Sequence, residues 1–383
     1  MITVRAIAGT QLPNTLGDAP VLTAEKYARQ ARSSAAPLRF ATSRSGVPAP
    51  VARPEHMTRL CADAFELAGM TPEDGQLNLA APAPHASGWM AQKGANTVGA
   101  SLLNRDFTDW ERPIDEGTAS RATVVSSVPA KAQEMADEIK ATQGSAADLF
   151  PNLEIGFFTG HLLRPGTRRR LRDRWGLEMT REFYGSSEAG MIAAAVDESR
   201  RLVPLLHRHI LELEVDDEIV DIRELAEPTE GSLLVTDPAR TSVNLTRYRQ
   251  GDLVRVYPDD PIPRLMPLGR ADDAVDFDGA LVHPGDLFEA VDEVFPTGSD
   301  AIAVVHDAER PVTIEVHIEG ATDAKSAAFY EALCTRQPAL RHALGSNPEG
   351  RLTTRIVDDL DELSVADDDG LKERQIVFTS EQD

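Results

Sequence analysis

The chain has 383 residues, with 39 Lys+Arg against 62 Asp+Glu, which gives a formal net charge of −23 at pH 7. This length predicts two or three domains with a substantial core, and the negative charge argues against nucleic acid or an anionic membrane as a general partner. No apolar run approaches the roughly 18 residues of a membrane span, and the first ten residues lack a signal-peptide pattern. We therefore expect a cytoplasmic protein with no nucleic-acid and no membrane partner.

The cysteine and lysine content narrows the class further. Cys61 and Cys334 are too few and too far apart for a Cys-rich zinc site or a disulfide scaffold. Only six basic residues are lysines, at positions 26, 93, 131, 140, 325 and 372, and the rest are arginines. Many carboxylates with few lysines favour a halophilic protein, because salt screens the self-repulsion of an acidic surface. The alternative is an ordinary acidic enzyme.

The first 200 residues alternate between strand-like and helix-like patterns. This alternation predicts an α/β sheet of largely parallel strands. Helices are expected over residues 24–33, 56–68, 129–140 and 166–175, and strands over 77–80, 122–128, 153–160 and 177–183.

The pattern changes after about residue 205. Strand-like segments over 210–215, 232–236 and 252–257 indicate a small β-rich subdomain. Beyond Gly269 the order of elements is typical of a compact α+β unit. Strands are expected there over 301–305, 313–318 and 352–357, and helices over 284–294 and 324–335.

The segment Phe183-Tyr-Gly-Ser-Ser-Glu-Ala-Gly190 follows a predicted strand and is rich in small residues. Small residues let the backbone approach a ligand, and hydroxyl and N–H groups can contact phosphate. Glu188 supplies an oxygen ligand of the kind that Mg²⁺ prefers. Taken alone, the same composition also fits an ordinary turn.

Two later segments contain acidic residues after glycine, Thr246-Arg-Tyr-Arg-Gln-Gly-Asp-Leu-Val254 and Gly269-Arg-Ala-Asp-Asp273. An aspartate after glycine at the start of a strand can accept two hydrogen bonds from a ribose diol, and an arginine such as Arg270 can assist. The alternative for each is a solvated charge at the end of a strand.

The order and spacing of four segments carry a resemblance to a known family. These are Tyr184–Glu188, Glu230–Thr236, Arg247–Asp252 and Gly269–Asp273. Together they resemble the adenylate-forming (acyl-CoA synthetase) superfamily, and most of all its phenylacetate–coenzyme A ligase-like branch. The resemblance covers about residues 150–290 and extends more weakly to the C-terminus.

The resemblance implies a large N-terminal AMP-binding α/β domain with a β-rich subdomain, over 1–268, and a small mobile C-terminal α+β domain, over 269–383. It implies an enzyme that joins a carboxylic acid to AMP, using ATP and Mg²⁺ and releasing pyrophosphate. Coenzyme A then accepts the acyl group. Because AMP turns a poor leaving group into a good one, positioning and charge neutralisation are the main tasks of the protein. The branch suggests an aromatic or otherwise apolar acid.

The resemblance also assigns roles to single residues. Tyr184 would stack near adenine, Glu188 would hold Mg²⁺, and Asp252, helped by Arg270, would bind the ribose hydroxyls. Asp272 would be the hinge. The α-phosphate and acyl carboxylate would be lined by Gly185, Ser186 and Ser187, and the adenine pocket would include Gly160 and His161, where His161 departs from the usual acidic residue.

Two segments depart from the family pattern. The nearest match to the phosphate loop is degenerate, with Val47 in the place of a lysine, and Arg44 could substitute electrostatically. Near the C-terminus Leu371 takes the place of the catalytic lysine, so Lys372, one residue later, becomes the candidate. The expected phosphate loop consists of Thr42, Ser43, Arg44, Ser45 and Gly46.

These departures keep two alternatives open. One is an adenylate-forming enzyme with an acceptor other than coenzyme A, and the other is a catalytically impaired nucleotide-binding pseudoenzyme. Whether the chain forms a homodimer stays open as well. His207 and His209 alternate as in a strand, but no third metal ligand is evident, so we favour a structural or salt-bridging role for both. A serine hydrolase lacks support because the Gly-x-Ser-x-Gly pattern is missing.

Overall fold

The computed structural model describes residues 2–14, 16–41, 47–82, 85–104, 115–160, 163–296, 299–307, 311–345, 350–360, 363 and 376–379. The expected phosphate loop (42–46), His161, Leu371 and Lys372 lie outside the described residues. The chain divides into two compact units. The first contains Met1–Leu162 and Leu171–Pro267, and the second contains Leu163–Arg170 and Leu268–Asp383. The sequence did not suggest that residues 163–170 group with the C-terminal part of the chain.

The main sheet of the first unit has, among the described residues, seven strands in the order β4 (Ser101–Asn104), β3 (Gly75–Asn78), β5 (Val124–Ser127), β6 (Ile155–Thr159), β7 (Met179–Ser186), β8 (Gly190–Ala194) and β9 (Val203–Pro204). Neighbouring strands from β4 to β7 are parallel, while β8 and β9 are antiparallel additions. The predicted α/β sheet of largely parallel strands is therefore confirmed.

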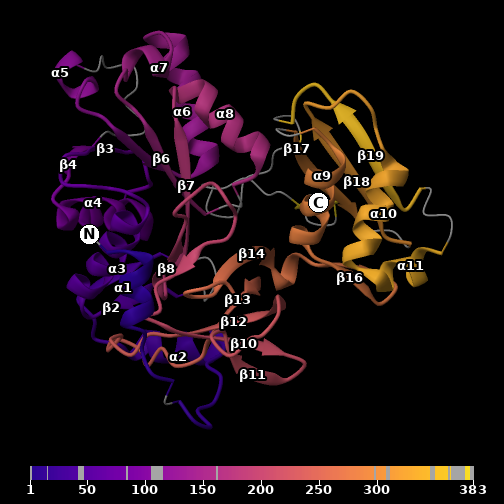
Figure 1. The fold of residues 1–383 in the computed structure, drawn as a ribbon, viewed down its shortest axis with the longest axis horizontal. Coiled ribbons are helices and arrows are strands. Elements are labelled where there is room, and N and C mark those ends of the chain that lie inside the picture. Colours follow the sequence, from indigo (N-terminus) through magenta and orange to yellow (C-terminus); the bar gives the residue numbers. More distant parts are fainter. Residues whose placement is uncertain are drawn as a thin grey trace. The chain divides into compact units, whose positions relative to one another are not determined.

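Helices cover both faces of this sheet (Figure 1). The crossovers from β5 to β6 and from β6 to β7 run in one direction along the sheet, so right-handed connections put α6 (Pro129–Thr142) and the end of α8 (Pro165–Trp175) on one face. The connection from β3 to β4 runs the opposite way and puts α4 (Ala86–Val98) on the other face. There α3 (Pro54–Leu67) also packs, with Phe65 against Phe157 and Phe183 at ring distances of 5.1 and 5.3 Å. Short helices α1 (Val4–Gly9), α5 (Glu116–Ala119) and α7 (Ala146–Leu149) complete this part.

The predicted β-rich subdomain is a second sheet of the first unit. Its described strands follow the order β11 (Glu218–Asp221), β10 (Ile210–Val215), β12 (Thr229–Thr236), β13 (Tyr248–Tyr257) and β14 (Arg264–Arg270). Helix α2 (Ala24–Ser33), which Thr23 caps by accepting a hydrogen bond from the Lys26 N–H, packs on β13 through Tyr27, whose ring lies 5.0 Å from that of Tyr248. A small hairpin of β1 (Leu38–Phe40) and β2 (Ala49–Val51) flanks the expected phosphate loop.

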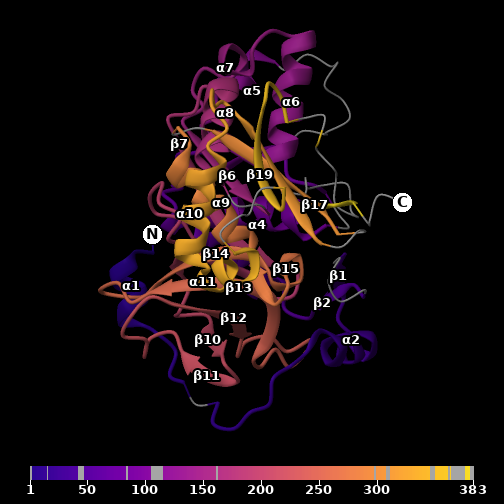
Figure 2. The ribbon, with the colours of Figure 1, turned by 90° about the vertical axis from the view of Figure 1, so that its right-hand side faces the viewer.

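The second unit has the predicted α+β organisation. Its described strands form a sheet in the order β19 (Leu352–Val357), β18 (Thr313–Glu319), β17 (Asp300–His306) and β20 (Ile376–Phe378), next to a hairpin of β15 (Val275–Phe277) and β16 (Ala280–Val282). The helical elements are η1 (Ala271–Asp273), α9 (Pro284–Val294), α10 (Ser326–Arg336) and α11 (Pro338–Leu344). Figures 1 and 2 show α9 and α10 beside β17–β19. Their apolar faces bury Phe277, Phe288 and Phe329 in one core.

A buried arginine ties residues 163–170 into the second unit. Arg164 is 0% exposed, and its guanidinium donates to Asp300 at 2.8 Å and to Asp292 at 2.9 Å. Thr167 adds a bond to Asp300 at 2.7 Å. Burial raises the pKa of Asp300, but Arg164 and Arg170 outweigh this effect and the pKa is lowered overall. The carboxylate is therefore held in its charged form.

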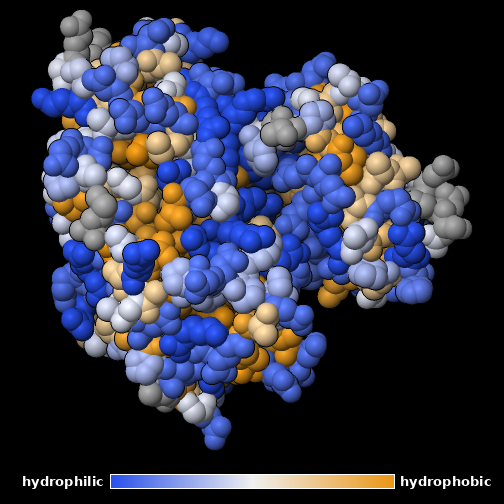
Figure 3. Space-filling model, viewed as in Figure 1, coloured by the Kyte–Doolittle hydropathy of each residue, from blue (hydrophilic) through white to orange (hydrophobic). Residues whose placement is uncertain are grey.

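The surface agrees with the acidic, polar composition. Hydrophilic residues dominate the face drawn in Figure 3, and among the described residues Leu281 is the large apolar side chain that stands out as exposed, at 51%. Cys61 and Cys334 are both free and buried, so neither takes part in a disulfide. Within the described ranges, no helix is both long and apolar enough to cross a membrane.

Candidate functional site

The Tyr-Gly-Ser-Ser-Glu segment forms the end of β7 and the turn into β8. The Ser186 hydroxyl closes this turn by accepting from the Ala189 N–H at 3.1 Å. Only glycine fits at Gly185, because a Cβ there would lie 2.4 Å from the Gly190 carbonyl oxygen. Tyr184, Ser186 and Ser187 stay partly exposed, whereas Glu188 is only 2% exposed. The small residues therefore serve the tight turn itself, and the hydroxyl-bearing side chains remain accessible.

Gly160 lies at the same edge of the main sheet as this turn. Thr159, the last residue of β6, pairs with Phe183 of β7, so Gly160 follows β6 where Tyr184 continues β7. Its φ of 94° suits glycine, and the residue is exposed. Ligands of open α/β sheets bind outside the carboxyl ends of the strands, and this is the edge that Gly160 and Tyr184 occupy.

Asp252 lies in a bulge inside β13, so the expectation that it begins a strand was wrong. The strand begins at Tyr248. Between the pairs Ser232–Leu253 and Leu234–Arg249, the chain advances two residues along β12 but four along β13. The extra residues include Gly251, whose φ of 75° permits the distortion. Bulges of this kind redirect side chains out of the regular ladder, and here the redirected side chains include Asp252.

A hydrogen bond joins the two motifs. The Tyr184 hydroxyl donates to Oδ2 of Asp252 at 2.7 Å, across 68 residues of sequence and between two different sheets. Both side chains are partly exposed. The first unit thus brings Tyr184, its neighbours in the turn, and Asp252 together, as a common nucleotide site requires.

The turn also contacts the strand that precedes the expected phosphate loop. The Ser187 hydroxyl donates to the Ala41 carbonyl at 3.1 Å, directly before residues 42–46. Directly after them Val47 is 7% exposed and packs in the main core of the first unit. The position that holds a lysine in the family pattern therefore contributes apolar packing here.

The two arginines of the Arg-Tyr-Arg sequence have structural partners. Arg247 binds both carboxylate oxygens of Glu212, each at 2.9 Å. Arg249 also binds both carboxylate oxygens of Glu214, with its Nε 2.8 Å from Oε2. Glu212 and Glu214 alternate along β10, so their side chains share one face of the second sheet. This pairing across β12 stabilises the sheet that positions Asp252.

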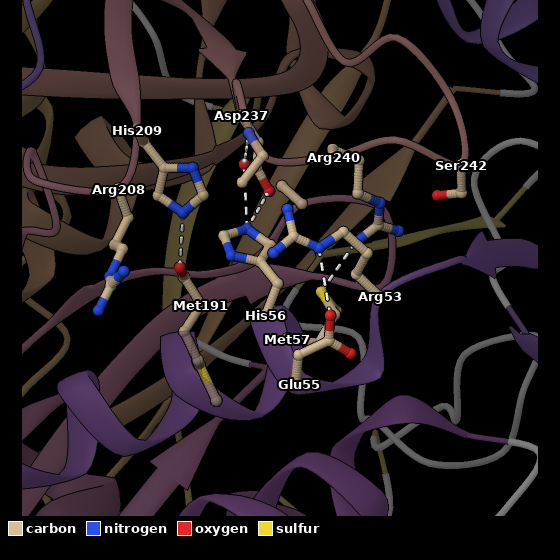
Figure 4. A network of polar contacts seen from close by, with 12 residues as sticks. Arg53, Glu55, His56, Met57, Met191, Arg208, His209, Asp237, Arg240 and Ser242 are labelled. Atoms are coloured by element: carbon tan, nitrogen blue, oxygen red, sulfur yellow. Dashed lines mark hydrogen bonds and ion pairs between the residues drawn. The ribbon is translucent and has the colours of Figure 1, made fainter.

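A buried polar cluster that the sequence did not suggest contacts β8 and α3 (Figure 4). His56 and Asp237 face one another with an Nε2–Oδ2 distance of 2.8 Å, and the His209 Nε2–H donates to the Met191 carbonyl at 2.9 Å. Burial raises the pKa of Asp237, but the hydrogen bond from His56 and nearby positive charge lower it overall. Complete burial lowers the pKa of His209, against the opposing effect of Asp237.

Arg240 connects this cluster to two elements near the turn. Its guanidinium, 6% exposed, donates to the Pro50 carbonyl of β2 at 3.1 Å and contacts Sδ of Met57 at 2.8 Å. Met57 in turn packs against Gly190, where a Cβ would lie 3.0 Å from its sulfur. Burial lowers the pKa of Arg240, while Tyr27, Asp237 and Glu188 oppose that effect. The cluster thus supports the turn and the β1–β2 hairpin from inside the protein.

The histidines considered for a metal site have structural roles instead. His207 bonds to the buried Asp63 at 2.8 Å. Residues 206–208 form a turn, so the strand-like alternation of His207 and His209 was wrong. In the part of the chain that the structure describes, no group of three or more His, Cys, Asp or Glu side chains could hold a metal ion.

Arg270 and Asp272 belong to the second unit, whereas Tyr184 and Asp252 belong to the first. They form an exposed pair at 3.3 Å, at the entry to η1. Neither the ribose contact expected for Arg270 nor the hinge role expected for Asp272 is tested by this geometry.

Comparison with known proteins identifies the fold. No family model and no curated protein matches the sequence. The structure of 2-hydroxyisobutyryl-CoA ligase in the postadenylation state with 2-HIB-AMP is similar, with a TM-score of 0.69 at 17% identity over 95% of this chain and 80% of that chain. Apo MatB from Rhodopseudomonas palustris is similar with a TM-score of 0.59 at 18% identity, over 90% of this chain and 67% of that one. This chain has the adenylate-forming ligase fold. The fold predicted from the four ordered motifs is thereby confirmed.

Proposed function

We propose that the protein is an ATP-dependent ligase that converts a carboxylic acid to an acyl-adenylate and then to a coenzyme A thioester. The observation that carries this proposal is the hydrogen bond between Tyr184 and Asp252, because it unites two motifs to which the family resemblance gives the same AMP moiety. We further propose that the enzyme belongs to a phenylacetate–coenzyme A ligase-like branch and therefore acts on an aromatic or apolar acid. This finer part depends on the sequences of the four motifs alone.

In the proposed reaction a carboxylate oxygen of the acid attacks the α-phosphorus of ATP, and the bond from that phosphorus to the bridging oxygen breaks to release pyrophosphate. The thiol of coenzyme A then loses its proton to solvent, its sulfur attacks the acyl carbon, and AMP leaves with the electron pair of the acyl–oxygen bond. Tyr184 would stack on adenine, and Ser186 would donate a hydrogen bond to an oxygen that carries developing charge. Ser187, whose O–H donates to the Ala41 carbonyl, would line the same site. Asp252 would bind the ribose, with Arg270 assisting.

The remaining roles in the proposal fall on other residues of the same motifs. Gly185 and Gly160 would let backbone approach the nucleotide, with His161 beside them. Lys372 would contact the acyl-adenylate, and Asp272 would be the hinge between domains 1–268 and 269–383. Residues 42–46 would receive the outer phosphates of ATP.

The residues present fit a magnesium ion only in part, because the turn supplies the carboxylate of Glu188 but that side chain is only 2% exposed. Mg²⁺ in such sites takes one or two protein carboxylates and fills its other positions with phosphate oxygens and water. Glu188 would provide one carboxylate, from the turn between β7 and β8 in which the Ser186 hydroxyl would meet the α-phosphate. When bound, the ion would neutralise charge on the phosphates, and the task of Glu188 would be to hold it in place.

One observation supports the pseudoenzyme as a second candidate. Val47, which stands where the family pattern has a lysine, is buried in the core. A shift of the chain that put another residue in this position would remove Val47 from the core and cost packing. A site that keeps Tyr184 and Asp252 but lacks this cation would bind AMP and turn over slowly. An acceptor other than coenzyme A is the remaining alternative for an active enzyme.

Pyrophosphate release tests these proposals directly. The full chain is incubated with ATP, Mg²⁺ and a panel of aromatic, branched and short aliphatic acids, at low and high salt, with and without coenzyme A. Acid-dependent pyrophosphate release supports adenylation, and coenzyme A-dependent AMP release supports the complete ligase. Nucleotide binding without any release supports the pseudoenzyme. Absence of nucleotide binding at every salt concentration contradicts all three.

A further inference from the structure

Tyr184 carries a hydroxyl whose bond to Asp252 is built by two separate distortions of regular structure. On β7 the pairing with β8 shifts by one residue between Tyr184 and Gly185. On β13 the bulge around Gly251 moves Asp252 out of the ladder with β12. Without either distortion the two side chains would follow the regular alternation of their own sheets. The contact at 2.7 Å therefore depends on local geometry from both sides.

We propose that the Tyr184 hydroxyl positions the Asp252 carboxylate for the ribose diol of the nucleotide. This inference depends on the proposed function, since it concerns the same site. It assigns to the hydroxyl a task separate from that of the ring: stacking needs only the aromatic face, whereas orienting Asp252 needs only the O–H group.

The chemistry of a carboxylate makes this arrangement suitable. A carboxylate has about four acceptor directions, so one bond from a tyrosine is compatible with two more from a diol. A partly exposed aspartate without a fixed partner samples several rotamers, and the ligand must then select one. Because Tyr184 already fixes Oδ2, the ordering is completed on folding, before the nucleotide arrives.

The alternative is that the bond only tethers the two sheets. A tether would affect stability, and its loss would weaken every nucleotide equally. A positioning role has a different signature, because removing the hydroxyl should weaken those ligands that have the ribose hydroxyls and leave the others nearly unchanged. The two roles are therefore distinguished by comparing nucleotides with and without the ribose hydroxyls, which a protein variant tested with one nucleotide cannot do.

The experiment measures binding of ATP, 2′-deoxyATP and 3′-deoxyATP to the full chain by calorimetry, for the wild type, Tyr184→Phe, Asp252→Ala and the double variant. We expect Tyr184→Phe to weaken ATP binding about threefold to tenfold, in line with the net worth of one hydrogen bond. The affinity for at least one deoxynucleotide should fall by a smaller factor. In the Asp252→Ala background, Tyr184→Phe should not change the affinity for ATP. Tyr257→Phe is the matched control, since Tyr257 ends the same strand and its ring lies under Arg201.

The outcomes separate the inference from the function. If the wild type prefers ATP to the deoxynucleotides but Tyr184→Phe binds all three as the wild type does, the positioning role is wrong and the proposed function survives. Equal weakening for all three nucleotides also overturns it and favours a tether. If the wild type binds none of them, both proposals fail. Thermal melting of each variant confirms that the compared proteins are folded.

Discussion

Two aspartates of the first unit each bond to a ring-bearing side chain, yet their surroundings differ. Asp237 is 2% exposed, and its carboxylate accepts from the ring of His56 and from the Ala239 N–H. Asp252 is partly exposed on a bulge and bonds to Tyr184. The first carboxylate is enclosed by protein groups, whereas the second meets solvent, as a ligand-binding group must. The comparison teaches that burial, and not the presence of a good hydrogen bond, separates a structural aspartate from a candidate binding one.

Replacing the enclosed carboxylate should give the largest effect. We expect Asp237→Ala to lower the free energy of unfolding by about 3 kcal/mol, because His56 and the Ala239 N–H lose their buried acceptor. Urea denaturation monitored by circular dichroism measures this change. A loss below about 1 kcal/mol would mean that the cluster contributes no more than an ordinary exposed contact.

Replacing the accessible carboxylate should affect binding more than folding. We expect Asp252→Ala to weaken ATP binding by about tenfold to a hundredfold, since hydrogen bonds to a charged acceptor contribute about 1.5–3 kcal/mol. Its free energy of unfolding should change by less than about 1 kcal/mol, because the site is partly solvated. Calorimetric titration beside urea denaturation measures both. Unchanged nucleotide affinity would remove the ribose assignment.

The elements that the sequence predicted best are those with strong local signals. Helix α2 was expected over 24–33 and is observed there, since Thr23 caps it and Glu25 lies in its first turn. Helix α4 was missed because prolines at 82 and 84 precede it and it contains Gly88 and Gly94, which lower helix propensity. Packing explains both glycines: a Cβ at Gly88 would lie 2.3 Å from the Ala81 carbonyl oxygen, and one at Gly94 would lie 2.9 Å from Cβ of Cys61.

The candidate site shows the same division between local and long-range information. The motif sequences identified Tyr184 and Asp252. The bulge that places Asp252 arises from the pairing of β13 with β12, and no local sequence pattern encodes that pairing. The partners His56 and Asp237 are 181 residues apart, so neither residue signals the other in the sequence. A histidine near the start of a helix and an aspartate after a strand were the only local signs of the cluster.

The buried cluster should also make stability depend on pH in a window of its own. Burial lowers the pKa of His209 from its ordinary 6.5. The neutral imidazole therefore makes its full contribution to the free energy of unfolding above pH 6.5, and this contribution is lost as the pH falls from 6.5 towards the lowered pKa. The expected slope is up to about 1.4 kcal/mol per pH unit for one proton. The aspartates with a lowered pKa, including Asp63 and Asp237, affect the pH dependence of stability only below their ordinary pKa of 3.8.

Urea denaturation at pH 7.5, 6.5 and 5.5 measures this dependence. His209→Gln keeps an N–H donor for the Met191 carbonyl but cannot take up a proton, so its unfolding free energy should change less over this range than that of the wild type. His342→Gln, in the last turn of α11 in the second unit, is the control and should keep the wild-type slope. Parallel curves for all three proteins would show that His209 does not cause the dependence.

The smallest effect should come from an ion pair at the rim of the second sheet. Arg255 and Glu230 pair between β13 and β12, with Glu230 40% exposed. Exposed pairs contribute little because water screens them and long side chains lose freedom when they pair. We expect Glu230→Ala to change the unfolding free energy by less than about 0.5 kcal/mol and to leave ATP affinity unchanged. Because Glu230 lies on the strand that pairs with the bulge, weakened ATP binding in this variant would show that the Asp252 region depends on the rim charges as well as on the buried contacts.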